Sequence, residues 1–270
     1  MSAKPDKFGP GPAGAATLAV VMAWLLSAGP CQAADVQPFT QVAAVGAYDG
    51  NISGHSDVAI SPWNTVYTKG PADWHGGLVA GGGVNLDVDD WLSALCVVDV
   101  AGQRYVDYPA LSGFFGSASF QGKAVDLPGD IDAILTYSFR EDFQGDSGHD
   151  VSGGIERPLP FAVVGASDIG YDWSLAADSS LGYQGPYVDI GANRRFRATG
   201  TWLMARVTGL VEGYSGRTDG IVSTSAEVSQ DLGEQTAIFG RVSYDWVYST
   251  EAGRSLSSPE FLVGTVWTYP

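Results

Sequence analysis

Apolar and polar residues alternate along the C-terminal third of the chain. Between Ala237 and Ser249 the even positions are mostly apolar and end in aromatic side chains, whereas the odd positions include Arg241 and Asp245. Residues 261–269 repeat the alternation, with aromatic and β-branched side chains at the odd positions. Successive side chains of a β-strand point to opposite faces, so a period of two predicts strands with one apolar and one polar face.

The same reading over the whole chain predicts about twelve strands, at residues 38–49, 76–88, 91–104, 113–125, 130–143, 150–157, 162–175, 186–197, 201–214, 220–232, 236–249 and 259–269. Tight connections alternate with longer polar ones, the longest at 50–75. Short turns at one end and longer loops at the other are typical of a transmembrane up-and-down antiparallel β-barrel. An even number of strands also lets the first pair with the last, which leaves no open edge in lipid. We therefore predict an all-β chain folded as such a barrel.

The N-terminal segment has the order of a secretory signal peptide. Lys4 and Lys7 precede an apolar stretch at 15–26 and a small-residue exit at 31–34. The apolar stretch is short for a membrane-spanning helix. We predict a cleavable signal peptide at 1–33, a barrel domain at 34–270 and export to the bacterial outer membrane. Cleavage leaves Cys96 as the sole cysteine, which excludes an intramolecular disulfide and a zinc site built on several thiolates.

The charge composition excludes one class of partner. Charged residues make up 16% of the chain, with 30 acidic against 14 basic residues and a formal net charge of −16, where an ordinary soluble domain has about 25% charged residues. Binding to nucleic acid needs clustered Lys and Arg that displace counterions from phosphates, so we expect no nucleic-acid partner.

Aromatic residues gather near the predicted strand ends and share phase with the apolar face. This placement is typical of the interfacial girdles of membrane barrels, the alternative being core filling in a soluble β-sandwich. They are Trp91, Tyr171, Trp173, Tyr244, Trp246, Tyr248, Trp267 and Tyr269.

Together with the aromatic-rich last strand at 263–269, these features resemble porin-type outer-membrane proteins of Gram-negative bacteria. A smaller likeness to porins of the TorF type rests on residues 77–81, 91–94 and 156–161. The resemblance implies insertion by the barrel assembly machinery. Such proteins usually end in Phe or Trp, which that machinery reads, whereas this chain ends in Tyr269 and Pro270.

If the apolar faces look towards lipid, the opposite faces line the lumen. By phase, the predicted pore-lining residues are Asp87, Asp99, Asp132, Arg140, Asp168, Asp172, Asp189, Arg195, Arg206, Glu212, Glu227, Asp231, Arg241 and Asp245. A net negative wall favours cations, and the alternative is that these charges pair with one another and plug the barrel. Turning Arg206 and Glu212 inward also turns Trp202 and Leu210 inward. Either the register slips there or an apolar patch lies inside.

No catalytic or metal motif stands out. His149 and Ser152 could form a nucleophile–base pair, but their opposite parity on one strand points them to opposite faces. Asp142, Asp146 and Asp150 lack the spacing of a calcium loop. We therefore expect no enzymatic activity, no cofactor and no metal site.

These observations predict an outer-membrane channel for passive diffusion of small hydrophilic solutes or ions, with a cation preference. The expected partners are outer-membrane lipid, the permeating solutes and the assembly machinery. Two alternatives stay open. One is a non-conducting barrel with a structural, adhesive or export-associated role, in which residues 50–75 bind a partner. The other is a soluble periplasmic β-sandwich.

Overall fold

The computed structural model describes residues 35–50, 72–107, 112–142, 147–175, 182–251 and 256–269. The predicted signal peptide and most of the 50–75 loop lie outside these ranges. The described residues form twelve strands: β1 (Asp35–Asp49), β2 (Asp73–Asp89), β3 (Leu92–Tyr105), β4 (Gly113–Leu127), β5 (Ile131–Asp142), β6 (Ser147–Leu159), β7 (Val163–Leu175), β8 (Tyr183–Phe196), β9 (Thr201–Tyr214), β10 (Thr218–Asp231), β11 (Thr236–Ser249) and β12 (Leu256–Tyr269). A short 3-10 turn, η2 (Pro160–Ala162), joins β6 to β7.

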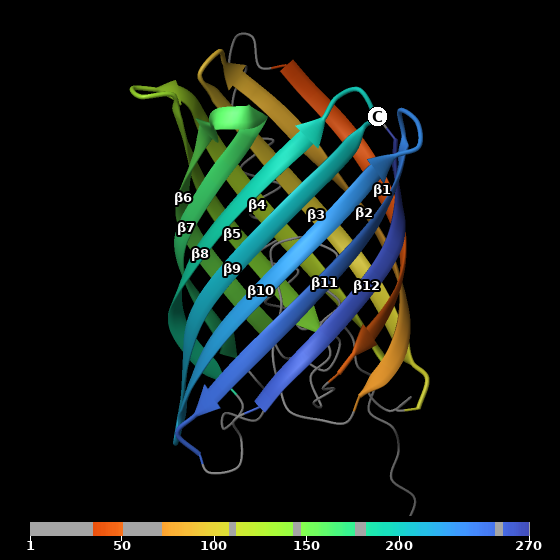
Figure 1. The fold of residues 1–270 in the computed structure, drawn as a ribbon, viewed down its shortest axis with the longest axis vertical. Coiled ribbons are helices and arrows are strands. Elements are labelled where there is room, and N and C mark those ends of the chain that lie inside the picture. The colour runs from red at the N-terminus through yellow and green to blue at the C-terminus, as the bar shows by residue number, and fades with distance from the viewer. Residues whose placement is uncertain are drawn as a thin grey trace, which may run out of the picture.

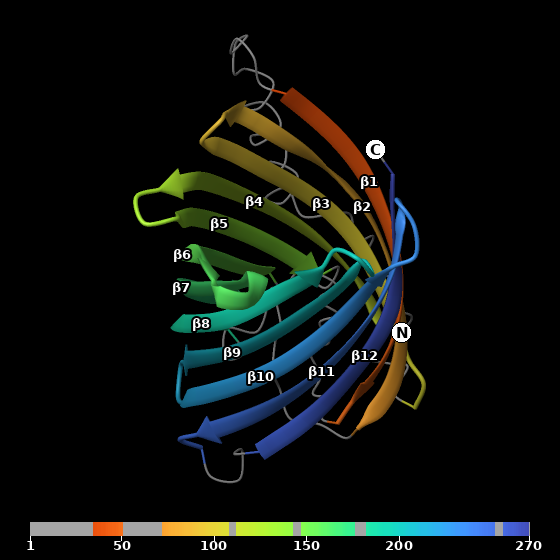
Figure 2. The same cartoon turned by 45° about the horizontal axis from the view of Figure 1, so that its top comes forward.

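The strands close into one antiparallel barrel (Figures 1 and 2). Each strand pairs with its neighbours in sequence, and β1 closes the barrel by pairing with β12 from Thr40 opposite Tyr269 to Asp49 opposite Glu260. Closure pairs both edges of the sheet, which a barrel in lipid requires because no water is present to satisfy an open edge. The predicted fold class, an all-β antiparallel barrel of twelve strands, is confirmed.

Side-chain exposure alternates along the strands as the sequence pattern predicts. On β8, for example, Asp189 is 2% exposed, whereas its neighbours Val188 and Ile190 are 46% and 60% exposed. Most exposed apolar side chains form the outer surface of the barrel, and most charged side chains of the strands point inward. Among the described residues, no helix is long and apolar enough to cross a membrane.

The β2–β3, β4–β5, β6–β7, β8–β9 and β10–β11 turns lie at the end of the barrel that also carries the start of β1 and the end of β12, here called the tight-turn end (Figure 1). At the other end the β9–β10 connection, residues 215–217, is also short, unlike the longer loop that the sequence pattern predicts there. The β8–β9 turn depends on a glycine: Gly200 has a φ of 69°, and a Cβ there would come within 3.0 Å of the Asp231 Cβ. The β6–β7 connection differs from the prediction. Pro158 and Leu159 belong to β6, and the chain turns only at η2, because Pro158 lies opposite Val164 without needing to donate a ladder hydrogen bond.

The outer apolar surface has the height of a bilayer core. On β8 the outward positions between Gln184 and Arg194 are Pro186, Val188, Ile190 and Ala192. Ten residue steps of about 3.3 Å, on a strand tilted by about 40°, span roughly 25 Å, which is the height of the apolar band of outer-membrane barrels.

Two apolar clusters lie on the inner face. The larger one runs over β12, β1, β2, β3 and β4 and contains Ala43, Val45, Ala47, Val79, Ala101, Phe115 and Leu262. The smaller one joins Leu210, Ile221 and Val247, with Tyr187 packed against them. Leu210 and Trp202 share their face with Arg206 and Glu212. The strand register is therefore continuous in β9, and an apolar patch lies inside the barrel.

Candidate functional site

The inner wall gathers charged side chains from most strands. The strand registers place the predicted charged residues on the inward face: Asp87 of β2, Asp99 of β3, Asp132 and Arg140 of β5, Asp168 and Asp172 of β7, Asp189 and Arg195 of β8, Arg206 and Glu212 of β9, Glu227 and Asp231 of β10, and Arg241 and Asp245 of β11. Contacts between strands that are not neighbours support this orientation. Arg195 of β8 reaches Asp231 of β10, and Gln41 of β1 reaches Asp99 of β3.

Carboxylates face one another directly across several strand pairs of this wall. Asp150 lies opposite Asp172, Asp168 opposite Asp189, and Glu212 opposite Asp219. The same arrangement places Asp132 opposite Glu156 and Asp35 opposite Asp87. Like charges directly opposite each other in a sheet repel, so each pair needs nearby positive charge or hydrogen-bond donors.

The buried Arg206 offsets the repulsion between Asp168 of β7 and Asp189 of β8. The Arg206 Nε donates to the Asp189 carboxylate, which also accepts a hydrogen bond of 2.5 Å from the Thr208 hydroxyl. The two charged side chains are 14% and 3% exposed. A buried charge is stabilised only when it is paired and hydrogen-bonded, so Arg206 and Asp189 depend on each other.

A second group of donors serves Glu212 and Asp219, near the longer loops. The Tyr214 hydroxyl donates to Glu212 at 2.7 Å. Asp219 accepts hydrogen bonds from Arg217 Nε at 2.8 Å and from the Ser249 hydroxyl at 2.5 Å. The Arg217 guanidinium also lies 3.6 Å from the centre of the Tyr214 ring. This part of the wall is a connected polar network rather than a row of isolated charges.

A single lysine bridges two strands on the opposite side. The Lys123 Nζ of β4 lies 3.0 Å from Asp132 of β5 and 2.6 Å from Glu156 of β6. Arg241 makes a similar link to Glu227, donating from Nε at 2.9 Å and from Nη2 at 2.6 Å. The positively charged side chains of Lys123 and Arg241 are thus held against the wall by carboxylates.

An acidic cavity lies at the tight-turn end of the barrel, against β1–β4. A cavity of about 680 Å³ is lined by Asp35, Asp87, Val88, Asp89, Asp90, Leu92, Ser93 and Val125. A second cavity of about 240 Å³ continues along the wall to Gln37, Asn85, Gln121 and Lys123. Asp87 lines both cavities.

The sequence prediction missed several members of the wall. Asp219 lies one residue before the predicted start of its strand at 220, whereas Asp150 and Glu260 lie within the predicted strands 150–157 and 259–269 but were not assigned to the wall. The Ser243 hydroxyl donates to Glu260 at 2.8 Å. Applying the alternation to every acidic residue of the predicted strands, and extending the strand at 220–232 by one residue, would have found these acidic residues. Lys123 was not among the predicted wall residues, although the alternation places it on the inward face of β4, where it pairs with Asp132 of β5 and Glu156 of β6.

The histidine considered as a catalytic base belongs to the outer surface. The His149 ring stacks on Trp173 at 5.1 Å, and its Nδ1 lies 3.1 Å from the Tyr137 hydroxyl. Ser152 lies opposite Thr136 on the other face of the sheet. Within the part of the chain that the structure describes, no group of three or more His, Cys, Asp or Glu side chains could hold a metal ion.

No family model matches this sequence, and no curated protein matches it. Solved structures do match. An outer membrane channel from Pseudomonas putida F1 superposes with a TM-score of 0.62 at 9% identity, over 89% of this chain and 98% of that one. A bacterial polysaccharide outer membrane secretin superposes with a TM-score of 0.50 at 7% identity, over 86% and 98% of the two chains. The chain has the fold of outer-membrane channel proteins. At these identities the likeness establishes the fold, and the function must be argued from the site.

Proposed function

We propose that this protein is an outer-membrane channel through which small hydrophilic solutes diffuse passively, with a preference for cations. The observation that carries the proposal is the set of directly opposed carboxylates on the inner wall, among them Asp168 opposite Asp189 and Asp35 opposite Asp87. Arg206, Arg241 and Lys123 are held by neighbouring carboxylates, and the acidic residues of the wall outnumber the basic ones, which leaves an excess of negative charge.

The size of the barrel supports a path for water. Twelve strands about 4.8 Å apart, tilted by about 45°, enclose a backbone cylinder of roughly 13 Å radius. That cylinder is wider than the eight-stranded barrels that side chains fill, and narrower than the sixteen-stranded porins with open channels. Bound charges of both signs around such a lumen set a field across it, and the net negative sign raises the local concentration of cations.

The outer surface supports a location in the membrane. Large apolar side chains such as Leu78, Ile169 and Val263 are more than 60% exposed, and this exposure is stable only in contact with lipid or a partner. The Pseudomonas putida protein of similar fold is itself described as an outer membrane channel, which agrees with the proposal.

Reconstitution of the purified protein into a planar bilayer tests the proposal. We expect discrete conductance steps from material whose mobility on a gel shifts with heating, the behaviour of a folded membrane barrel. Heat-shifted protein that produces no steps would contradict the channel and favour the non-conducting barrel. Extraction from membranes without detergent would contradict the membrane location.

A further inference from the structure

One sector of the outer surface carries positive charge and no negative charge. The carboxylates of β6, β7, β8 and β9 all lie on the inner face, at Asp150, Glu156, Asp168, Asp172, Asp189 and Glu212. The outward positions of these four strands include Arg157 and Arg194. In a chain with 30 acidic and 14 basic residues, an acid-free basic sector is an exception to the overall charge.

The arginines of this sector lie together at the tight-turn end. Arg194 lies opposite Val163, which in turn lies opposite Leu159, two residues beyond Arg157. Arg197 follows in the β8–β9 turn and is exposed. Among the described residues, no carboxylate forms an ion pair with these three arginines. Arg194 lies 4.5 Å from the centre of the Phe196 ring.

The neighbouring β6–β7 turn holds an aromatic side chain in the open. Phe161 is 83% exposed, with φ of 66° and ψ of 28°, and Ala162 follows with φ of 56°. A left-handed conformation costs roughly 1–2 kcal/mol for each residue that is not glycine. Figures 1 and 2 show this turn beside the β8–β9 turn at the same end of the barrel.

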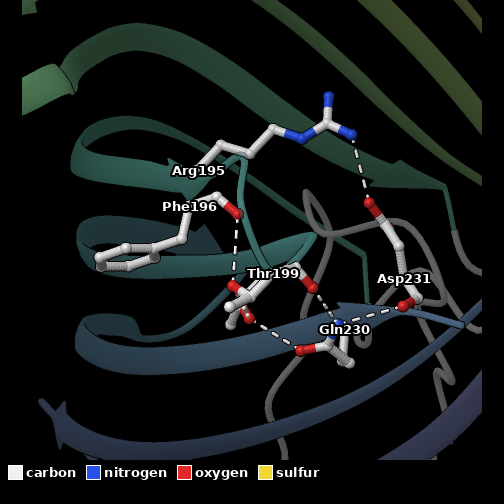
Figure 3. Close-up of polar contacts among 6 residues, drawn as sticks. Arg195, Phe196, Thr199, Gln230 and Asp231 are labelled. Atoms are coloured by element: carbon white, nitrogen blue, oxygen red, sulfur yellow. Dashed lines mark hydrogen bonds and ion pairs between the residues drawn. The ribbon is translucent and has the colours of Figure 1, made fainter.

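A polar network holds the β8–β9 turn in place (Figure 3). The Gln230 amide donates to the carbonyl oxygens of Thr199, at 2.5 Å, and Asp231, at 3.0 Å, and its own oxygen accepts from the Thr201 hydroxyl at 2.7 Å. On the inner side, Arg195 binds Asp231 at 3.2 Å. Figure 3 shows that the Phe196 ring and the Arg195 side chain point away from each other. The turn therefore separates an inner arginine, which is paired, from the outer arginines.

The height of this surface matches the headgroup level of a bilayer. Arg194 lies at the end of the apolar stretch of β8 that begins after Gln184. Arginine on the lipid face is strongly unfavourable at the bilayer midplane and nearly neutral at the interface. Aromatic side chains also favour the interface. The next connection along this end, the β4–β5 turn, is acidic: it carries Asp130, and Asp126 lies just before it in β4.

We propose that Arg157, Arg194, Arg197 and Phe161 form a docking surface for the headgroup of an anionic phospholipid in the leaflet at the tight-turn end. The guanidinium groups bind the phosphate through charge-assisted hydrogen bonds. Phe161 inserts beside the headgroup at the level of the interface. This proposal rests on the membrane location given above and is independent of whether the barrel conducts.

Lipid titration of the full-length protein in detergent, followed by native mass spectrometry, tests the surface. The probes are phosphatidylglycerol, phosphatidylcholine and inorganic phosphate. We expect phosphatidylglycerol to be retained in preference to phosphatidylcholine. Each arginine near an anionic lipid surface contributes about 1 kcal/mol, so Arg157→Gln with Arg194→Gln is expected to weaken phosphatidylglycerol binding roughly 25-fold. Inorganic phosphate alone is not expected to displace the lipid.

The matched control is the double variant Arg104→Gln with Arg140→Gln, which removes the same charge from the outer face of β3 and from the inner face of β5, both near the end of the barrel opposite the β8–β9 turn. It is expected to retain wild-type lipid preference. Equal binding of the two lipids by the wild type, or equal loss in the two double variants, would overturn the docking surface. Displacement by inorganic phosphate would show an anion site that does not recognise the lipid. If the protein did not enter membranes at all, that result would instead contradict the proposed membrane location.

Discussion

Replacing Arg206 with methionine is expected to lower the free energy of unfolding by about 3–5 kcal/mol. The substitution removes the guanidinium that neutralises Asp189 while keeping a flexible side chain of similar length. Asp189 would then remain as a charge with a 3% exposed side chain, facing Asp168 across the strand pair. Breaking a buried ion pair from one side has this large effect because the remaining charge is left without compensation. Denaturant titration of the protein in lipid vesicles, with gel mobility as the reporter of folding, measures the change.

Arg195→Met is the matched control for this experiment. Arg195 also pairs with a carboxylate, Asp231, but the two side chains are 52% and 34% exposed. Exposed ion pairs contribute about 0–1 kcal/mol, so little change is expected. Equal effects of the two substitutions would contradict the buried role of the Arg206–Asp189 pair.

Reversing the charge of Asp87 is expected to produce the largest change in ion selectivity. Asp87 lines both cavities at the tight-turn end, so Asp87→Lys places a positive charge at the proposed entrance of the channel. A unit charge about 5 Å from a passing ion contributes somewhat under 1 kcal/mol at the dielectric constant of water. A change of two charge units, acting in opposite senses on cations and anions and reduced by salt screening, should lower the cation-to-anion permeability ratio roughly tenfold. Reversal potentials in a planar bilayer measure this ratio.

The control for Asp87→Lys is Glu234→Lys. Glu234 lies in the exposed β10–β11 turn at the same end of the barrel. Its substitution by lysine changes the net charge by the same amount as Asp87→Lys. We expect its permeability ratio to stay near the wild-type value, and the effect of Asp87→Lys to shrink at about 1 M salt, where the screening length falls to about 3 Å. An unchanged ratio in Asp87→Lys would place the permeation path away from the two cavities.

The architecture could be predicted because the period-two pattern is a local property. Strand number, order and the orientation of residues such as Tyr244 and Asp245 follow from alternation and from turn lengths. The ends of the strands could be predicted less accurately than their number and order. The polar residues that continue strands beyond the membrane, such as Asp219, resemble loop residues. At Pro158 a turn residue lies inside a strand because no ladder donor is needed there.

The polarity of the inner wall could also be predicted, whereas its pairings could not. Lys123 meets Glu156 across the intervening β5, which depends on the registers of two strand pairs. The opposition of Asp150 and Asp172 likewise arises from register. In β9 the sequence left two readings of Trp202 and Leu210, and only the packing of Leu210 against Ile221 and Val247 decides between them.

The sign of the reversal potential of the wild-type protein tests the central claim most directly. With potassium chloride at different concentrations on the two sides of a planar bilayer, the acidic inner wall predicts discrete channels whose reversal potential corresponds to potassium permeating faster than chloride. A reversal potential of the opposite sign would contradict the cation preference. The absence of any conductance from correctly folded protein would contradict the channel itself.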